Sequence, residues 1–168
     1  MVRLEQVLDS WKTVRGDTID AVDEFPAAEF DYRLAPDVMT FGEIARHILD
    51  AGDGLTGLLL AGEEDFATPN FRDKLKPHMR SVDAGAPGLS AALRESIDQR
   101  TTQLAALPAD FYSQMIKGRG GQTLTRLEML QFVKEHELTH RAQLFVSMRI
   151  KGIVPATTRR RLAKQAGK

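Results

Sequence analysis

The sequence predicts an all-α protein, a four-helix bundle with a long crossover between its second and third helices. Four stretches carry apolar residues at the three- and four-residue spacing of an amphipathic helix. No stretch between turn residues alternates apolar and polar side chains as a strand would. Residues 62–88 form a long connection rich in proline and glycine, and such a connection lets the helices on either side point the same way.

The first two helices are expected over residues 2–22 and from Thr40 to about residue 59. Residues 2–22 carry one apolar stripe, which includes Trp11. Thr40 is followed three residues later by Glu43, the hydroxyl and carboxylate pattern of a capping box at a helix start. The second helix also contains three glycines, Gly52, Gly54 and Gly57. Each stabilises a helix less than alanine would, by up to about 1 kcal/mol. They indicate either close packing against a neighbouring segment or a break in the helix.

The third and fourth helices follow the long connection. The third spans roughly residues 89–107 and ends at Pro108. The fourth begins near Thr125, which starts a second capping box, and runs to about Ile150. Gly152 then ends it, because glycine readily adopts the left-handed conformation that follows many helices.

Length and composition favour one domain over residues 1–158 with a basic, flexible tail over residues 159–168. The 168 residues include no cysteine, which excludes disulfides and thiolate metal sites. No apolar run approaches the roughly 18 residues needed to span a bilayer, and the first residues do not form a signal peptide. We therefore expect no membrane partner and a cytoplasmic location.

The charges are unevenly distributed although the net charge is zero. Residues 141–168 contain eight basic and no acidic residues, whereas residues 1–140 carry a net charge of −8. A basic tail can attract nucleic acid, and binding through residues 159–168 would be sensitive to salt. Because the rest of the chain has no basic face with interleaved aromatic residues, a solvated terminus is the favoured interpretation and nucleic-acid binding is disfavoured.

Three histidines form the most informative pattern in the chain. His136 and His140 lie four residues apart on one helix face, which lets two imidazoles reach one metal ion. His47 lies on or beside the apolar stripe of the second helix and is the favoured third ligand. His78, in the proline-rich connection, is expected at the surface. Three histidines leave a coordination position open, as catalytic metal sites do, and they suit zinc, nickel, copper or iron.

Residues 136–140 also match His-Glu-x-x-His, the helix motif of zinc proteases. In those enzymes the glutamate is the general base and a third ligand lies downstream. No His, Asp or Glu follows His140, so the protease interpretation is disfavoured. Glu137, Asp50 and Glu43 lie within one turn of a proposed ligand and are candidates to orient the histidines. The commoner arrangement is that each faces solvent, with Glu43 serving as a helix cap.

The ordered set of motifs resembles the DinB superfamily over most of the chain. The resemblance begins with Thr-Phe-Gly-Glu-Ile-Ala-Arg-His at 40–47 and continues through Thr-Arg-Leu-Glu-Met-Leu at 125–130. It includes His-Glu-Leu-Thr-His-Arg-Ala-Gln-Leu at 136–144 and closes with Met-Arg-Ile-Lys-Gly-Ile-Val-Pro at 148–155. Many relatives have His-Glu-x-His-His-Arg-Gly-Gln, whereas this chain has Thr139 and Ala142.

The resemblance implies a bundle with the long crossover and a divalent metal, zinc, nickel or iron, held by His47, His136 and His140. It also implies a homodimer and a reaction that uses a low-molecular-weight thiol such as bacillithiol or mycothiol. The leading hypothesis is a metal-dependent transferase that joins such a thiol to an electrophilic small molecule. A hydrolase that uses metal-bound hydroxide, and a non-enzymatic metal- or ligand-binding stress-response protein, are the alternatives. In each case residues 62–88 and the glycine-rich loop 118–121 would form the walls of the pocket.

Overall fold

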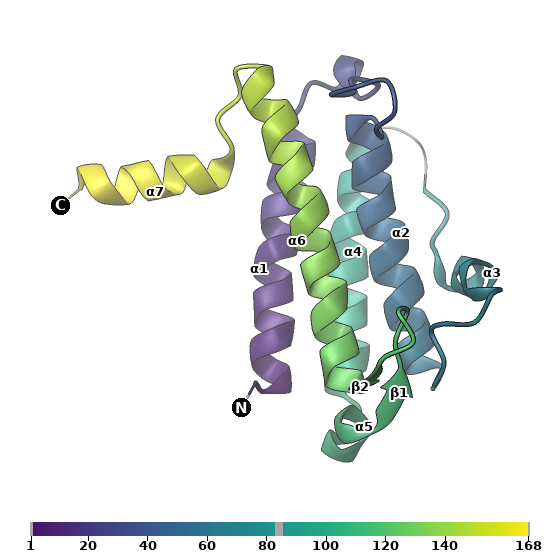
Figure 1. Cartoon of the computed structure of the whole chain (residues 1–168). Coiled ribbons are helices and arrows are strands. Elements are labelled where there is room, and N and C mark those ends of the chain that lie inside the picture. Colours follow the sequence, from purple (N-terminus) through teal and green to yellow (C-terminus); the bar gives the residue numbers. More distant parts are fainter. Residues whose placement is uncertain (1, 83–85, 168) are drawn as a thin grey trace.

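The structure is a computed structural model that describes residues 2–82 and 86–167. It confirms the four-helix bundle (Figure 1), whose long helices are α1 (Leu4–Glu24), α2 (Phe41–Leu60), α4 (Ala86–Ala105) and α6 (Arg126–Ile150). Helices α1 and α2 each pack against both α4 and α6. Both α2 and α4 begin at the upper end of the bundle in Figure 1 and descend, so the crossover joins helices that point the same way.

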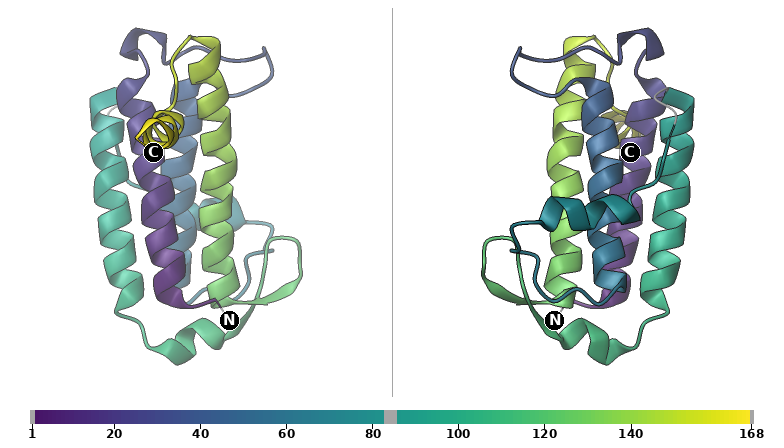
Figure 2. Two further views of the ribbon diagram at one scale, coloured as in Figure 1. Left: turned by 90° about the vertical axis from the view of Figure 1, so that its left-hand side faces the viewer. Right: turned by 90° about the vertical axis from the view of Figure 1, so that its right-hand side faces the viewer.

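Shorter elements occupy the connections. These are η1 (Ala27–Glu29), α3 (Phe71–Leu75), η2 (Lys76–His78), α5 (Ala109–Ser113), β1 (Met115–Lys117), β2 (Thr123–Thr125) and α7 (Ala156–Ala166). The crossover does not run freely through solvent, because α3 and η2 both contact α2. The right-hand view of Figure 2 shows α3 lying across α2 at about its middle.

The antiparallel hairpin of β1 and β2 is a difference from the expected all-helical pattern. Met115 lies opposite Thr125 in this hairpin. Each strand has only three residues, so its alternation of apolar and polar side chains is too short to distinguish a strand from a loop in the sequence. Gly121 makes the turn with φ near +81°, a conformation that glycine adopts at little cost. A bridge between Asp65 and Lys117 ties the hairpin to the crossover.

The boundaries of α2 and α6 follow the predicted capping signals. Thr40 accepts a hydrogen bond from the backbone N–H of Glu43, and the Glu43 carboxylate accepts one from the backbone N–H of Thr40. Thr125 and Glu128 make the same reciprocal pair before α6. Gly152, with φ near +75°, follows the last turn of α6 as expected.

Close packing accounts for the glycines of α2, which is unbroken. A Cβ atom at Gly57 would lie 2.4 Å from the Cβ of His78, and one at Gly54 would lie 3.0 Å from Leu75. The two glycines therefore allow the α3–η2 segment to approach α2. His78, expected at the surface, is half-buried against this helix.

A buried carboxylate fixes the crossover to the bundle. Asp53 of α2 is fully buried and accepts hydrogen bonds from Arg80, Ser96 and Arg100. Arg80 belongs to the crossover, whereas Ser96 and Arg100 belong to α4. One carboxylate thus joins three segments, and it explains why Arg100 interrupts the predicted apolar stripe of the third helix.

In Figure 1 a loop descends from the upper end of α6, and helix α7 then projects away from the bundle. Residues 159–166, expected to form a flexible tail, belong to this helix. Arg159 pairs with Glu24, and Arg160 pairs with Asp17 and Asp20, all on α1. Part of the basic charge at the end of the chain is thus matched by α1. Within residues 2–82 and 86–167, no helix combines the length and apolar character needed to cross a membrane.

Candidate metal centre

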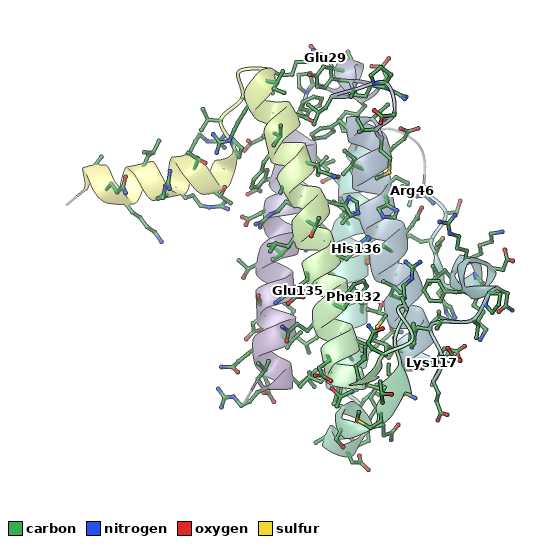
Figure 3. The ribbon with its side chains drawn as sticks, in the orientation of Figure 1. Glu29, Arg46, Lys117, Phe132, Glu135 and His136 are labelled. Carbon is green, nitrogen blue, oxygen red and sulfur yellow. The ribbon has the colours of Figure 1, made fainter. Side chains whose placement is uncertain are left out.

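The three predicted histidines meet between α2 and α6. One ring nitrogen from each of His47, His136 and His140 lies within 4.8 Å of the other two. Figure 3 shows His136 at the side of α6 that faces α2. All three side chains are partly buried, so the cluster is screened from bulk water yet reachable.

The spacing of the nitrogens fits a metal ion. The Nε2 atoms of His47 and His136 are 3.3 Å apart. Two ligands at about 2.0–2.1 Å in a tetrahedral arrangement would be separated by about 3.3–3.4 Å. The Nδ1 atom of His140 lies 2.9 Å from the Oε1 atom of Gln143. Because an amide oxygen can only accept, Nδ1 carries the hydrogen and Nε2 keeps the lone pair that a metal requires.

The protonation of the site also suits a metal. Burial lowers the pKa of His47, the charge of His140 lowers it further, and Asp50 partly opposes both effects. Burial, followed by the neighbouring histidines and Arg119, lowers the pKa of His136 to about 4. His136 is therefore neutral near pH 7, and neutral imidazole is the form that binds metals.

Glu137 corrects the expectation that this carboxylate faces solvent. It is almost completely buried and accepts hydrogen bonds from Trp11, Arg15 and Thr18 of α1, with the Nε of Arg15 at 2.7 Å. Its position immediately after His136 turns it about 100° around α6, away from the histidine cluster. The carboxylate is therefore engaged in the core and is not placed as the general base of a zinc protease.

The other two candidate carboxylates have different places. Glu43 is the helix cap, as expected, and its side chain is 58% exposed. Asp50 is half-buried and accepts a hydrogen bond from Arg46 at 2.8 Å. Asp50 lines both of the cavities that adjoin His47, but its described hydrogen bond is to Arg46 and not to a histidine.

Two cavities of about 460 Å³ each meet at His47 and Asp50. The first lies beside the start of α2, and its wall includes Phe30 and Asp31 from the preceding connection. The second lies between α2, α6, the crossover and the hairpin loop. Its wall contains residues from both segments that were predicted to line the pocket. These are Phe71, Arg72, Leu75, Lys76 and Met79 from the crossover and Arg119 from the loop.

The fold and the cluster define a class of protein, a four-helix bundle whose facing helices bring three histidines within reach of one metal ion. The sequence profile of the DinB superfamily matches residues 10–144, and the chain belongs to this superfamily. No curated protein is similar enough in sequence to match the chain.

Solved structures that are similar to this bundle include the following three. A DinB-like protein from Bacillus subtilis has 19% identity and a TM-score of 0.68, with 88% of this chain and 92% of that chain covered. YfiT from Bacillus subtilis, described as a probable metal-dependent hydrolase with an unusual four-helix bundle topology, has 16% identity and a TM-score of 0.66, with 89% and 88% covered. The mycothiol-dependent maleylpyruvate isomerase has 16% identity and a TM-score of 0.63, with 85% of this chain but only 61% of that chain covered.

Proposed function

We propose that the protein is a metal-dependent enzyme that transfers a low-molecular-weight thiol to an electrophilic small molecule. The observation that carries the proposal is the meeting of two cavities at His47. A transfer between two molecules needs a place for each beside the same reactive centre, and positioning both reactants removes much of the barrier. The similarity to a mycothiol-dependent isomerase supports thiol chemistry.

In this proposal His47, His136 and His140 hold a divalent zinc, nickel or iron ion. Three neutral imidazoles leave such an ion its full positive charge, with which it favours the thiolate, the nucleophilic form of a thiol. Gln143 holds the ring of His140 in the binding tautomer. The chain contains no cysteine, so the reacting sulfur must come from a second molecule.

The simplest reaction of this class is addition of the thiol across an activated double bond. The sulfur forms a bond to the electrophilic carbon, and the proton released from the thiol enters the adduct, so no oxidant or leaving group is required. The half-burial of the histidines reduces competition from water at the same centre.

A hydrolase that uses the same three ligands is the second candidate, and the similarity to YfiT favours it. The two functions differ in their need for a thiol. A hydrolase would turn over ester or amide substrates with no thiol present, whereas the transferase would consume thiol and electrophile in equal amounts.

The resemblance to the family further implies a cytoplasmic homodimer, and sedimentation at several concentrations would test the dimer.

The first experiment measures metal content and thiol conjugation in the same preparations. We expect near-stoichiometric metal in the native protein and none in a His47→Ala/His136→Ala variant with an unchanged helical circular dichroism spectrum. Thiol conjugation should disappear with the metal. The His78→Ala variant is the matched control, because this fourth histidine lies outside the cluster, and it should retain the metal. Full conjugation by the double variant would refute the proposal.

A further inference from the structure

We infer that the second cavity, bounded by α2, α3, α6 and the hairpin loop, binds a co-substrate that joins an apolar body to a carboxylate or phosphate, and that Arg119 anchors this anionic group. The inference rests on the proposed function and deepens it by naming the chemical class of one reactant. It is carried by the apolar wall, the cations at the cavity and the contrasting charge of the first cavity.

Apolar side chains make up much of the wall of this cavity. Leu55 and Phe71 are buried, and Leu75 is partly buried beside them. Phe132, labelled in Figure 3, is 40% exposed although it is a large apolar residue, and it lies one turn before His136. A ligand with an apolar body would remove this ring from water, which accounts for its place beside the histidines.

Cationic side chains accompany this apolar wall. Arg72, Lys76 and Arg119 line the cavity, and Asp50 is the acidic residue among its described lining. The carboxylate of Asp50 is already paired with Arg46. Lys76 is likewise paired, with Asp73 outside the lining. Within residues 2–82 and 86–167, neither Arg72 nor Arg119 forms an ion pair with a carboxylate. The cavity therefore carries an excess of positive charge even before a metal ion binds.

Arg119 is well placed to bind an anion. Its guanidinium lies over the ring of Phe71, 4.7 Å from the ring centre. Such a cation–π contact needs no hydrogen-bond acceptor, so the N–H donors of the guanidinium can bind a planar carboxylate or a phosphate. The loop that carries it is held by hydrogen bonds from Gly118 to Gln122 and from Gly121 to Gly118. Arg119 and His136 line the same cavity.

The first cavity has the opposite character. Asp31, Glu43 and Asp50 line it together with a single described cation, Arg46. An anion would be repelled there and attracted to the second cavity, since the electrostatic field of a cleft selects for charge. The distribution of charge therefore assigns the anionic reactant to the cavity that contains Arg119.

Calorimetric titration with 4-phenylbutyrate, its neutral analogue 4-phenylbutyramide and 3-phenylpropyl phosphate tests the inference. Each probe is titrated into metal-loaded and metal-free protein, because a carboxylate can also bind a metal directly. We expect the anions to bind more tightly than the amide in both forms. Which anion binds more tightly distinguishes a carboxylate substrate from a phosphate substrate.

The Arg119→Gln variant should lose about tenfold in affinity for the anions, the effect of removing a charge-assisted hydrogen bond, with less change for the amide. Arg161→Gln, which removes an exposed cation of α7 outside this cavity, should bind as the native protein does. Equal affinities for anion and amide, no binding of any probe, or an Arg119 effect that vanishes without metal would each overturn the inference. Binding needs no turnover, so a failure of thiol transfer alone would refute only the proposed function.

Discussion

Glu137 illustrates how two adjacent residues of one helix serve different purposes. His136 faces α2 and the second cavity, whereas Glu137 faces α1 and compensates the buried charge of Arg15. Both members of this ion pair are nearly inaccessible, so neither can recover solvation from water if the other is removed. Such a pair is costly to break although it contributes little net stability when intact.

The Glu137→Gln variant should therefore lose about 3 kcal/mol of the free energy of unfolding, because Arg15 would remain buried without a counter-charge. Denaturation by urea measures the loss. Glu135→Gln is the control on the same helix, since Glu135 is exposed, and it should change stability by less than about 0.5 kcal/mol. Similar losses in the two variants would contradict the role of the pair. Both variants should keep the metal.

Tyr112 gives a second prediction for a single residue. Burial raises the pKa of Tyr112 to about 12, and its hydroxyl donates to the carbonyl oxygen of Leu104 at 2.5 Å. The folded state thus keeps a proton that the unfolded chain, with a tyrosine pKa of about 10, releases first. The stability from this group is fully present below about pH 10 and is lost as the pH rises through about 12.

Tyr112→Phe should accordingly flatten the decline in the free energy of unfolding between about pH 10 and 12, relative to the native protein. Urea denaturation at several pH values in this window measures the slope. Tyr32→Phe removes the other tyrosine and should leave the decline in place. If Tyr112→Phe has the native slope, the buried hydroxyl does not contribute in this way.

The sequence predicted the histidine cluster but missed the buried ion pairs. Helical spacing places His136 and His140 on one face, and the apolar stripe around His47 orients it inward, so periodicity alone is informative. The sequence alone does not distinguish Glu137 and Asp53 from exposed acidic residues, because their burial depends on partners from other segments. The sequence signal that could have revealed the buried ion pairs was that Arg15 and Arg100 each interrupt an apolar helix stripe.

Among the elements, the crossover has only short helices of its own, such as the five residues of α3, and Asp53 joins it to α2 and α4. Asp53→Asn would leave Arg80 and Arg100 with a neutral partner in a largely buried place. We expect a loss of about 3 kcal/mol in stability and faster hydrogen exchange in residues 71–80. Asp98→Asn on the exposed side of α4 should have neither effect. Unchanged exchange in Asp53→Asn would show that the crossover is held by other contacts.

The long elements were predictable because each has a periodic apolar stripe, and α2 and α6 also begin with a capping box. The hairpin and α7 were not. Three-residue strands contain too few positions for alternation, and their pairing depends on contact with the crossover at Asp65. Helix α7 has a buried residue only at Ala156. Two of its cations, Arg159 and Arg160, are matched by carboxylates of α1, which lie more than a hundred positions earlier in the sequence.

For the whole molecule, a metal at the cluster would join α2, through His47, to α6, through His136 and His140. A ligand that binds only the folded state stabilises it, by about 2.7 kcal/mol when present at 100 times its dissociation constant. Zinc or nickel should therefore raise the Tm of the metal-free protein, and a chelator should reverse the change. The His140→Ala variant should show no rise. A native Tm that is insensitive to metal would argue against the three-histidine site.

The division between rigid helices and connecting segments has an evolutionary consequence. The histidines belong to α2 and α6, whereas much of the wall of the second cavity belongs to the crossover and the hairpin loop. Segments 66–79 and 118–121 can therefore diverge while the bundle and its histidines stay as they are, provided that Asp53 keeps its arginine partners. Grafting these two segments from one relative onto another would exchange substrate preference between two enzymes without rebuilding either metal centre.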